Sequence, residues 1–127
     1  MVLSTHNACH GSFRAGGTIS KYRGVTWDAT NGYPYVIQCT AITDKCVGVV
    51  QTAAVSGDAV DVIVHGPTFV AADGAFSRGD SLGPSTDGQF DTAASTSYPC
   101  AIAHQAAAAA GDEVEAFFTG YPESAKA

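Results

Sequence analysis

Residues 46–66 read CVGVVQTAAVSGDAVDVIVHG, and residues 100–120 read CAIAHQAAAAAGDEVEAFFTG. The two stretches align without a gap at an offset of 54 positions, with eight identities in 21 positions. The identical pairs include the leading cysteines, Cys46 and Cys100, and the Gly-Asp dipeptides at 57–58 and 111–112. Self-similarity at a fixed spacing indicates an internal structural repeat.

Each copy of the repeat has the pattern of a β unit. The turn dipeptides Asn31-Gly32 and Asp87-Gly88 stand upstream of the copies, and they are a strong hairpin signal because both residues adopt positive φ readily. Strands are expected at 18–27, 35–40, 47–51, 60–64, 89–92, 101–105 and 114–118. We therefore predict an all-β fold, a compact β-sandwich or barrel built from two pseudo-symmetric β units at about 25–66 and 80–120, ending at Gly66 and Gly120.

The five alanines at 106–110 favour a helix on propensity alone. Five residues are too few to nucleate a stable helix, and Gly111 would end it at once. The alanine run is therefore predicted to be a loop.

The composition supports strands over helices. The chain has 127 residues, which suits one domain at 18–122, and its charged fraction of 14% is below the value of about 25% typical of soluble domains. It holds 12 Val and 5 Ile against 2 Leu, and β-branched side chains favour strands. No apolar run reaches the length of about 18 residues that a transmembrane helix needs, and the first ten residues lack the pattern of a signal peptide. We expect no membrane association.

Charge is unevenly distributed along the chain. Residues 1–27 contain three basic side chains and no acid, whereas all 12 acidic residues lie in the remaining hundred, and the net charge is −6. Three basic residues on an acidic domain are too few for a nucleic-acid footprint, so direct nucleic-acid binding is not expected. The asymmetry indicates that residues 1–17 form a flexible amino-terminal arm, contributing little to the stability of the β domain, while 123–127 form a carboxyl-terminal tail.

Residues 79–83, Gly-Asp-Ser-Leu-Gly, match the G-x-S-x-G nucleophile elbow and the GDSL motif of an esterase family. An elbow needs a strand–turn–helix setting and a histidine oriented by an acid. The residues after Ser81 are Pro-Ser-Thr-Asp-Gly, which is a turn, and no Asp-x-x-His follows. The favoured interpretation is a turn at 79–80 leading into a strand at 81–82, and we expect no enzymatic activity and no catalytic residue.

His6, Cys9 and His10 place three zinc or copper ligands within five residues. A closed site needs a fourth ligand, so a polar arm is favoured and neither a metal nor another cofactor is predicted. Cys39 and Cys46 flank a short loop and could bridge, although free thiols are the default without an export signal.

Four aromatic residues gather around the first hairpin: Tyr22, Trp27, Tyr33 and Tyr35. Aromatic faces stack on sugar rings, so a carbohydrate-binding β module is one interpretation. Contacts within the core or between subunits are the other, because aromatic side chains often supply both. Since Tyr33 and Tyr35 share one face of a strand, at most half of this group is expected to be exposed.

The order of these elements resembles the capsid cement, or decoration, proteins of tailed bacteriophages. The resemblance covers about residues 15–121: a basic first strand, the frame Trp-Asp-Ala-Thr-Asn-Gly at 27–32, Cys-Val-Gly-Val-Val-Gln at 46–51, a small-residue loop to Gly57-Asp58, a strand ending in Gly66, Gly-Asp-Ser-Leu at 79–82 and then the second copy. It implies a small β domain, usually a homotrimer, that binds the outside of the assembled major capsid protein lattice and stabilises the head.

That resemblance implies a structural virion protein, made in the host bacterial cytoplasm and located on the outer capsid surface. The family has no catalytic residues to transfer. Arg14, Lys21 and Arg23 are then the candidate capsid-binding residues, because a basic segment suits an acidic capsid surface. The four aromatic residues become candidates for oligomer or glycan contacts.

Overall fold

The computed structural model describes residues 9–122, which form nine strands and no helix. The strands are β1 (Cys9–Ala15), β2 (Gly24–Trp27), β3 (Tyr35–Gln38), β4 (Gly48–Val50), β5 (Ala59–Ala71), β6 (Ser81–Pro84), β7 (Phe90–Thr92), β8 (Ala101–Ala103) and β9 (Glu113–Phe118). They join in one mixed sheet in the order β1-β3-β2-β4-β5-β9-β8-β6-β7. The all-β prediction is confirmed, and the alanines at 106–110 lie in a loop.

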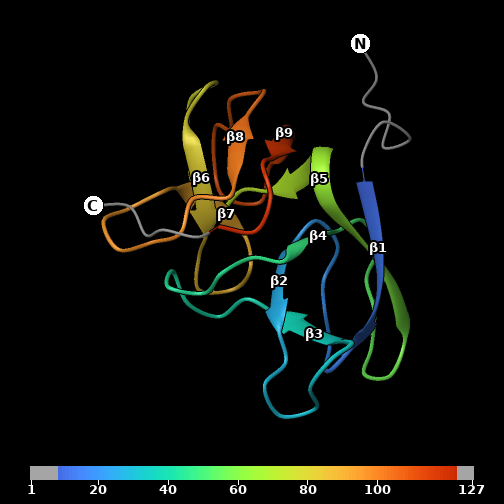
Figure 1. Cartoon of the computed structure of the whole chain (residues 1–127). Coiled ribbons are helices and arrows are strands. Elements are labelled where there is room, and N and C mark those ends of the chain that lie inside the picture. The colour runs from blue at the N-terminus through green and yellow to red at the C-terminus, as the bar shows by residue number, and fades with distance from the viewer. Residues whose placement is uncertain (1–8, 123–127) are drawn as a thin grey trace.

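The first four strands and the beginning of β5 close into a small barrel, called here the first lobe. β1 pairs with β3 in parallel, and antiparallel pairs then join β3 to β2, β2 to β4 and β4 to β5. The ring closes because the same half of β5 also pairs with β1, from Cys9 opposite His65 to Arg14 opposite Ala59. This lobe is the lower part of Figure 1, with β1 in blue and β2 and β3 in cyan.

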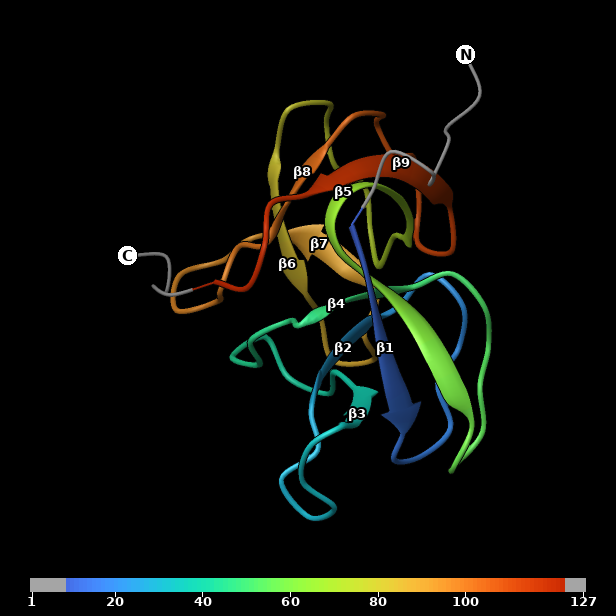
Figure 2. The same cartoon turned by 45° about the vertical axis from the view of Figure 1, so that its right-hand side comes forward.

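The second half of β5 opens a second ring of the same kind, the second lobe. β5 pairs with β9, β9 with β8, β8 with β6 and β6 with β7, all antiparallel. A parallel bridge between Ala72, just after β5, and Phe90 in β7 closes the ring. Figure 2 shows β5 curving out of the first lobe into the second beside β9. Gly66 lies at this bend with a φ of +113°, a conformation that favours glycine.

The two lobes repeat one pairing pattern. The Cα pair Phe13–Val60 of the first lobe corresponds to Val70–Val114 of the second lobe. In the same way, Trp27–Val36 corresponds to Pro84–Phe90. In both cases the first residue of the pair is shifted by 57 positions and the second residue by 54. β1 therefore corresponds to the second half of β5. Because β1 runs antiparallel to β5, the operation that relates the lobes reverses the strand direction, as a twofold rotation does. The predicted pair of pseudo-symmetric units is confirmed.

Each lobe has a hydrophobic core made by equivalent residues. The core of the first lobe consists of Ala15, Ile19, Val25, Val36, Val50, Ala54, Val60 and Val62. Their counterparts in the second lobe, in the same order, are Ala72, Phe76, Leu82, Phe90, Ala103, Ala107, Val114 and Ala116. Cys39, Cys46 and Val49 also belong to the second cluster, so the cores meet where the lobes join.

A Gly-Asp turn precedes a strand at 57–58, 79–80 and 111–112, with glycine φ values of +92°, +91° and +93°. In each turn the aspartate carboxylate accepts a hydrogen bond from the backbone N–H three residues earlier, at 3.0, 2.9 and 3.2 Å respectively. The fourth equivalent place, before β2, holds Tyr22 at a φ of +61°. The motif thus recurs twice per lobe, once without glycine.

The expectation that residues 1–17 form an arm separate from the β domain is wrong for residues 9–15. They form β1, which pairs on both sides and buries Ala15 completely. The strand was missed because the partly buried Gly11 and Phe13 alternate with the exposed Ser12 and Arg14, so only one large apolar residue marks its inner face. Residues 1–8 and the expected tail at 123–127 lie outside the described residues.

Two details of the predicted repeat are also corrected. β5 does not end at Gly66, because glycine lets the strand bend and continue to Ala71. Cys46 is not the counterpart of Cys100: the N–H of Val47 donates to Val25 as that of Cys100 donates to Leu82. The second copy has one additional residue in the loop between Ala107 and Gly111. The residues before this loop are therefore displaced by one position from the ungapped alignment, and Cys100 corresponds to Val47.

Deleting residues 1–14 is expected to unfold the first lobe, because the barrel then loses the strand that closes it. The melting temperature should fall by at least about 10 °C, since the lost pairing and burial amount to several kcal/mol. Deleting residues 1–8 is the control, because it leaves every described contact in place. A Tm of the shorter protein equal to that of the control would show that β1 does not support the fold.

Candidate binding surface

Three aromatic side chains of the first lobe are in contact and form a partly exposed surface, called here the aromatic surface: the partly buried Phe13 of β1, Trp27 of β2 and Tyr33 of the loop after it. The Trp27 ring lies 5.6 Å from Phe13, edge on, and 6.1 Å from Tyr33, with centroid-to-centroid distances in both cases. Trp27 is 41% exposed and Tyr33 is 80% exposed. Large aromatic side chains in such a position are typical of binding sites.

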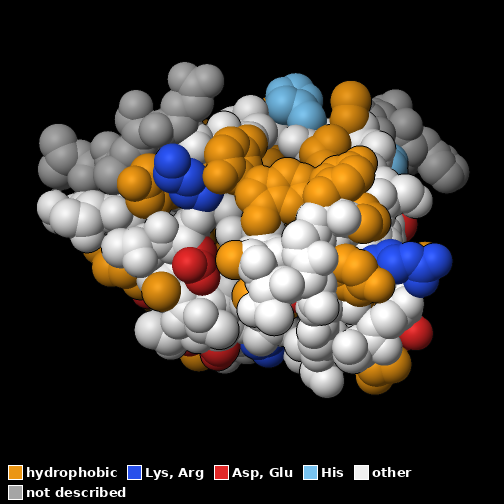
Figure 3. Space-filling view, turned by 60° about the horizontal axis from the view of Figure 1, so that its bottom comes forward, with side chains coloured by type: hydrophobic (Ala, Val, Ile, Leu, Met, Phe, Trp, Pro, Cys, Tyr) orange, Lys and Arg blue, Asp and Glu red, His pale blue; other side chains and the backbone are white. Residues whose placement is uncertain are grey.

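Figure 3 shows the molecule turned so that the bottom of Figure 1 comes forward. Hydrophobic side chains gather across the middle of this face in a continuous area. Isolated exposed apolar residues are ordinary on soluble proteins, whereas a contiguous group marks an interaction surface. The ring contacts and the exposure of Trp27 and Tyr33 give the aromatic surface the properties of a contact site.

The β2–β3 loop that carries Tyr33 is organised by Asp28, a buried residue. Its carboxylate accepts hydrogen bonds from the backbone N–H groups of Thr30 and Asn31 and from the Asn31 side-chain amide, at 2.9, 3.2 and 2.6 Å. Gly32, at a φ of +75°, donates its N–H to the Asp28 carbonyl. The Asn31 side chain, together with these backbone donors, lowers the pKa of Asp28 below its ordinary value. The loop is thus held by one ionised carboxylate.

The other two aromatic candidates lie elsewhere. The Tyr22 ring packs on Phe69 of β5 with a centroid distance of 5.7 Å. Its backbone N–H donates to the carbonyl of Val50 and its carbonyl accepts from the N–H of Ala71, so Tyr22 lies at the junction of the lobes. Tyr35 is half-buried in β3. Two of the four aromatic candidates are therefore exposed, within the predicted limit of half. The predicted reason is wrong, because Tyr33 lies in the loop before β3 and does not share a strand face with Tyr35.

The three basic candidates contact three separate parts of the molecule. Arg14 donates to the carbonyl of Gly57 at 3.0 Å. Lys21 pairs with Glu113 of the second lobe at 3.6 Å, and Arg23 donates to the carbonyl of Asp87 at 2.8 Å. Among residues 9–122, Arg14 has no acidic partner.

Three of the four cysteines meet in the core at the lobe junction. Cys39 and Cys46 lie with their Sγ atoms 3.5 Å apart, and all four cysteines are free thiols, the expected default. The hydrogen bond to Cys46, together with burial, raises the pKa of Cys39, and the hydrogen bond to Cys100 does the same for Cys46. Their raised pKa values favour the uncharged thiol at Cys39 and Cys46.

The remaining motifs take ordinary places in the fold. Ser81 begins β6 directly after the turn at 79–80, as predicted, and no helix follows it within the described chain. Cys9 and His10 lie in β1, where His10 Nδ1 is 2.7 Å from Asp61, while His6 is outside the described residues. Within residues 9–122 no three histidine, cysteine or acidic side chains are grouped to hold a metal ion. Nor does this part of the chain form an apolar helix of membrane-spanning length.

A cavity of the second lobe was missed by the sequence analysis. It has a volume of about 580 Å³ and lies beside the turn at 79–80, with Glu115 of β9 in its wall. No local pattern could have found it, because its lining comes from three segments that are distant in the sequence: the turn at 78–79, the residues of and after β8 at 102–105, and Glu115 of β9.

The fold resembles that of a phage protein. The N base of the head fibre protein gp8.5 of bacteriophage phi29 superposes with a TM-score of 0.69, covering 91% of this chain and 98% of that one, at 18% sequence identity. The shared fold thus extends over both lobes. No protein-family model and no curated protein matches the sequence.

We expect the order of the β2–β3 loop to depend on pH through Asp28. Because its pKa is lowered in the folded state, the stabilisation is present above its ordinary value of 3.8 and is lost as the pH falls through the lowered pKa. The Tm difference between the protein and Asp28→Asn should therefore be largest near about pH 6 and shrink towards about pH 3. Asn31→Ala, which removes the principal cause of the shift, should show a weaker pH dependence. A difference that stays constant over this range would contradict the assignment.

Proposed function

We propose that this protein is a structural component of a phage head, a decoration protein that binds the outer surface of the assembled major capsid protein lattice. The observation that carries the proposal is the fold: both lobes are shared with the N base of the phi29 head fibre protein. The sequence resemblance to capsid cement proteins, found independently of the structure, supports the same class of protein.

The surface chemistry supports a binding role. The aromatic surface offers anchors that lose water on contact, and Arg14 beside it in sequence keeps a charge that no acid of the described chain neutralises. We assign the principal contact to Trp27 and Tyr33, with Arg14 as the charged contact; Lys21 and Arg23 are weaker candidates because both have acidic partners nearby. The protein acts by binding, without catalysis and without a cofactor.

The protein would stabilise the head if it binds the assembled capsid lattice in preference to the free capsid subunits. A protein that binds the assembled lattice and not the free capsid subunit shifts the equilibrium toward the assembled state by mass action. Many copies on a symmetric shell favour a symmetric oligomer, and a homotrimer is part of the proposal. The net charge of −6 argues against contact with nucleic acid.

Co-sedimentation with heads of the phage that encodes the chain tests the proposal. The protein should pellet with heads and not with free capsid subunits, and its occupancy should fall at least about tenfold in Trp27→Ala/Tyr33→Ala, as expected for aromatic anchors. Tyr121→Ala, which removes another half-exposed aromatic ring, is the control and should bind normally. Absence of binding by the unchanged protein would refute the proposal, and equal losses in both variants would refute the assignment of the contact.

A second candidate function, carbohydrate binding, is favoured by one observation: the neighbouring Trp27 and Tyr33 rings are both exposed. Since Trp27 is the single tryptophan, a stacked sugar should change its fluorescence saturably. Tyr33→Ala should weaken the response by at least about tenfold, whereas Tyr121→Ala should not change it. A glycan array and fluorescence titration that both give no response would exclude this function.

A further inference from the structure

The cavity of the second lobe has one acidic residue, Glu115, in its wall. The lining residues are Arg78, Gly79, Ile102, Ala103, His104, Gln105 and Glu115. Its volume of about 580 Å³ falls within the range of roughly 300–1,000 Å³ found for ligand sites. His104 is fixed in the wall by ring contact with Phe117, at a centroid distance of 5.9 Å.

Glu115 is only 9% exposed. Its backbone N–H and carbonyl are both hydrogen-bonded, whereas within the described chain its carboxylate is not. Its N–H donates to the Gln105 side chain at 2.8 Å, and its carbonyl accepts from the N–H groups of His104 and Gln105 at 3.0 and 3.2 Å. Among residues 9–122, nothing forms a hydrogen bond or an ion pair with its carboxylate. Among the buried side-chain polar atoms of residues 9–122, only Arg23 Nε lacks a partner, so the unpaired carboxylate oxygens of Glu115 keep contact with solvent and can accept from a donor that enters the cavity.

The equivalent acid in the first lobe shows what is missing. Asp61, 54 positions earlier, pairs with His10 of β1 at 2.7 Å. The position equivalent to His10, by the shift of 57 that relates β1 to the second half of β5, is Pro67. Proline supplies neither a charge nor a donor. The second lobe therefore keeps the acid of this pair and lacks its basic partner.

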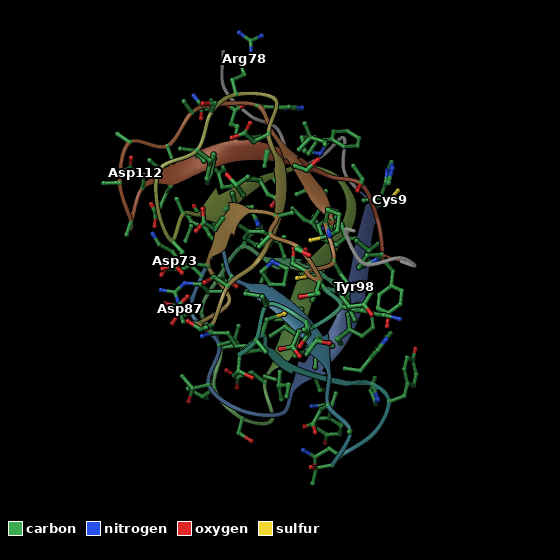
Figure 4. All side chains as sticks on the ribbon, turned by 90° about the vertical axis from the view of Figure 1, so that its left-hand side faces the viewer. Cys9, Asp73, Arg78, Asp87, Tyr98 and Asp112 are labelled. Carbon is green, nitrogen blue, oxygen red and sulfur yellow. The ribbon has the colours of Figure 1, made fainter. Side chains whose placement is uncertain are left out.

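Arg78 does not fill that role in the structure. It lies in the turn at the mouth of the cavity, and Figure 4 shows its side chain extending away from the body of the molecule. Its equivalent, Lys21, pairs with Glu113 on the neighbouring part of β9. The carboxylate of Glu115 thus remains open toward the cavity.

We propose that this cavity binds an arginine side chain of a partner protein, with Glu115 as the anion that pairs with its guanidinium group. Arginine suits the site better than lysine, because the guanidinium is more weakly hydrated and donates two parallel hydrogen bonds to one carboxylate. The partner residue supplies to Glu115 the hydrogen-bond donor that His10 supplies to Asp61 in the first lobe. The inference does not depend on capsid binding, since it rests on the cavity and the internal comparison.

Titration with the peptide acetyl-Gly-Arg-Gly-amide, followed by backbone amide NMR, tests this inference on the full chain. Saturable shifts are expected around Gly79, Gln105 and Glu115. The matched peptide with citrulline, which has the same shape without the charge, should bind at least about tenfold more weakly. Equal binding of the two peptides would overturn the proposal, as would the absence of saturable shifts at these residues.

Three variants separate the site from general charge effects. Glu115→Gln should weaken binding of the arginine peptide at least about tenfold, whereas Glu113→Gln, an equal change of charge outside the cavity, should alter it less than about twofold. Arg78→Ala should bind as tightly as the unchanged protein or more tightly. Equal losses in the two glutamate variants, or loss of binding in Arg78→Ala, would overturn the proposal. Retained Tm values confirm that each variant is folded.

Methylguanidine distinguishes a protein side chain from a free cation. If the peptide binds more tightly than methylguanidine, contacts beyond the guanidinium contribute, as a partner chain requires. Equal affinity would assign the cavity to small cations and overturn the protein partner.

Discussion

The whole molecule depends on β5 being hydrogen-bonded in two barrels at once. Its first half closes the first lobe against β1 and β4, and its second half opens the second lobe against β9. A single strand can serve both only if the chain turns between them without a break in the ladder. Gly66, at a φ of +113°, permits that bend. The lobes are therefore coupled covalently and through the sheet, and neither completes its ring without a segment that continues into the other.

The small barrels explain the composition. A five-stranded ring encloses little space, so its core is filled mainly by valine and alanine, and the chain contains 22 Ala and 12 Val. The two cores are built from side chains of different size at equivalent positions. Where the first lobe has Ile19, Val25 and Val36, the second has the larger Phe76, Leu82 and Phe90. Where the first has Val50 and Val62, the second has Ala103 and Ala116. Such compensating changes preserve packing density while the sequences diverge.

The sequence revealed the features that backbone geometry requires and missed those that depend on pairing between distant strands. The Gly-Asp turns at 57–58 and 111–112 were found because a positive φ demands glycine there, and the alternating valines of β5 were found by their period. The fourth turn was hidden because Tyr22 takes the glycine position. β1 was hidden because a glycine, a serine and an arginine surround Phe13. Of the binding features, Trp27 and Tyr33 were among the four aromatic candidates around the hairpin, but the sequence did not indicate which of the four are exposed. The open carboxylate of Glu115 was not anticipated, because nothing local indicates that its opposite position lacks a base.

An internal duplication allows structural requirements to be separated from functional ones. Residues that the fold needs recur in both lobes, as the core positions and the turns do. Residues that differ without a structural reason lie in the two proposed sites. Phe13 and Trp27 of the aromatic surface correspond to Val70 and Pro84, so the second lobe has no counterpart of that surface. Tyr22 corresponds to Gly79, and the His10–Asp61 pair corresponds to Pro67 with Glu115. Of these residues of the second lobe, Gly79 and Glu115 line the cavity. Since one fold holds both lobes, these differences are not demanded by folding. The two proposed contacts, one on each lobe, rest on these differences.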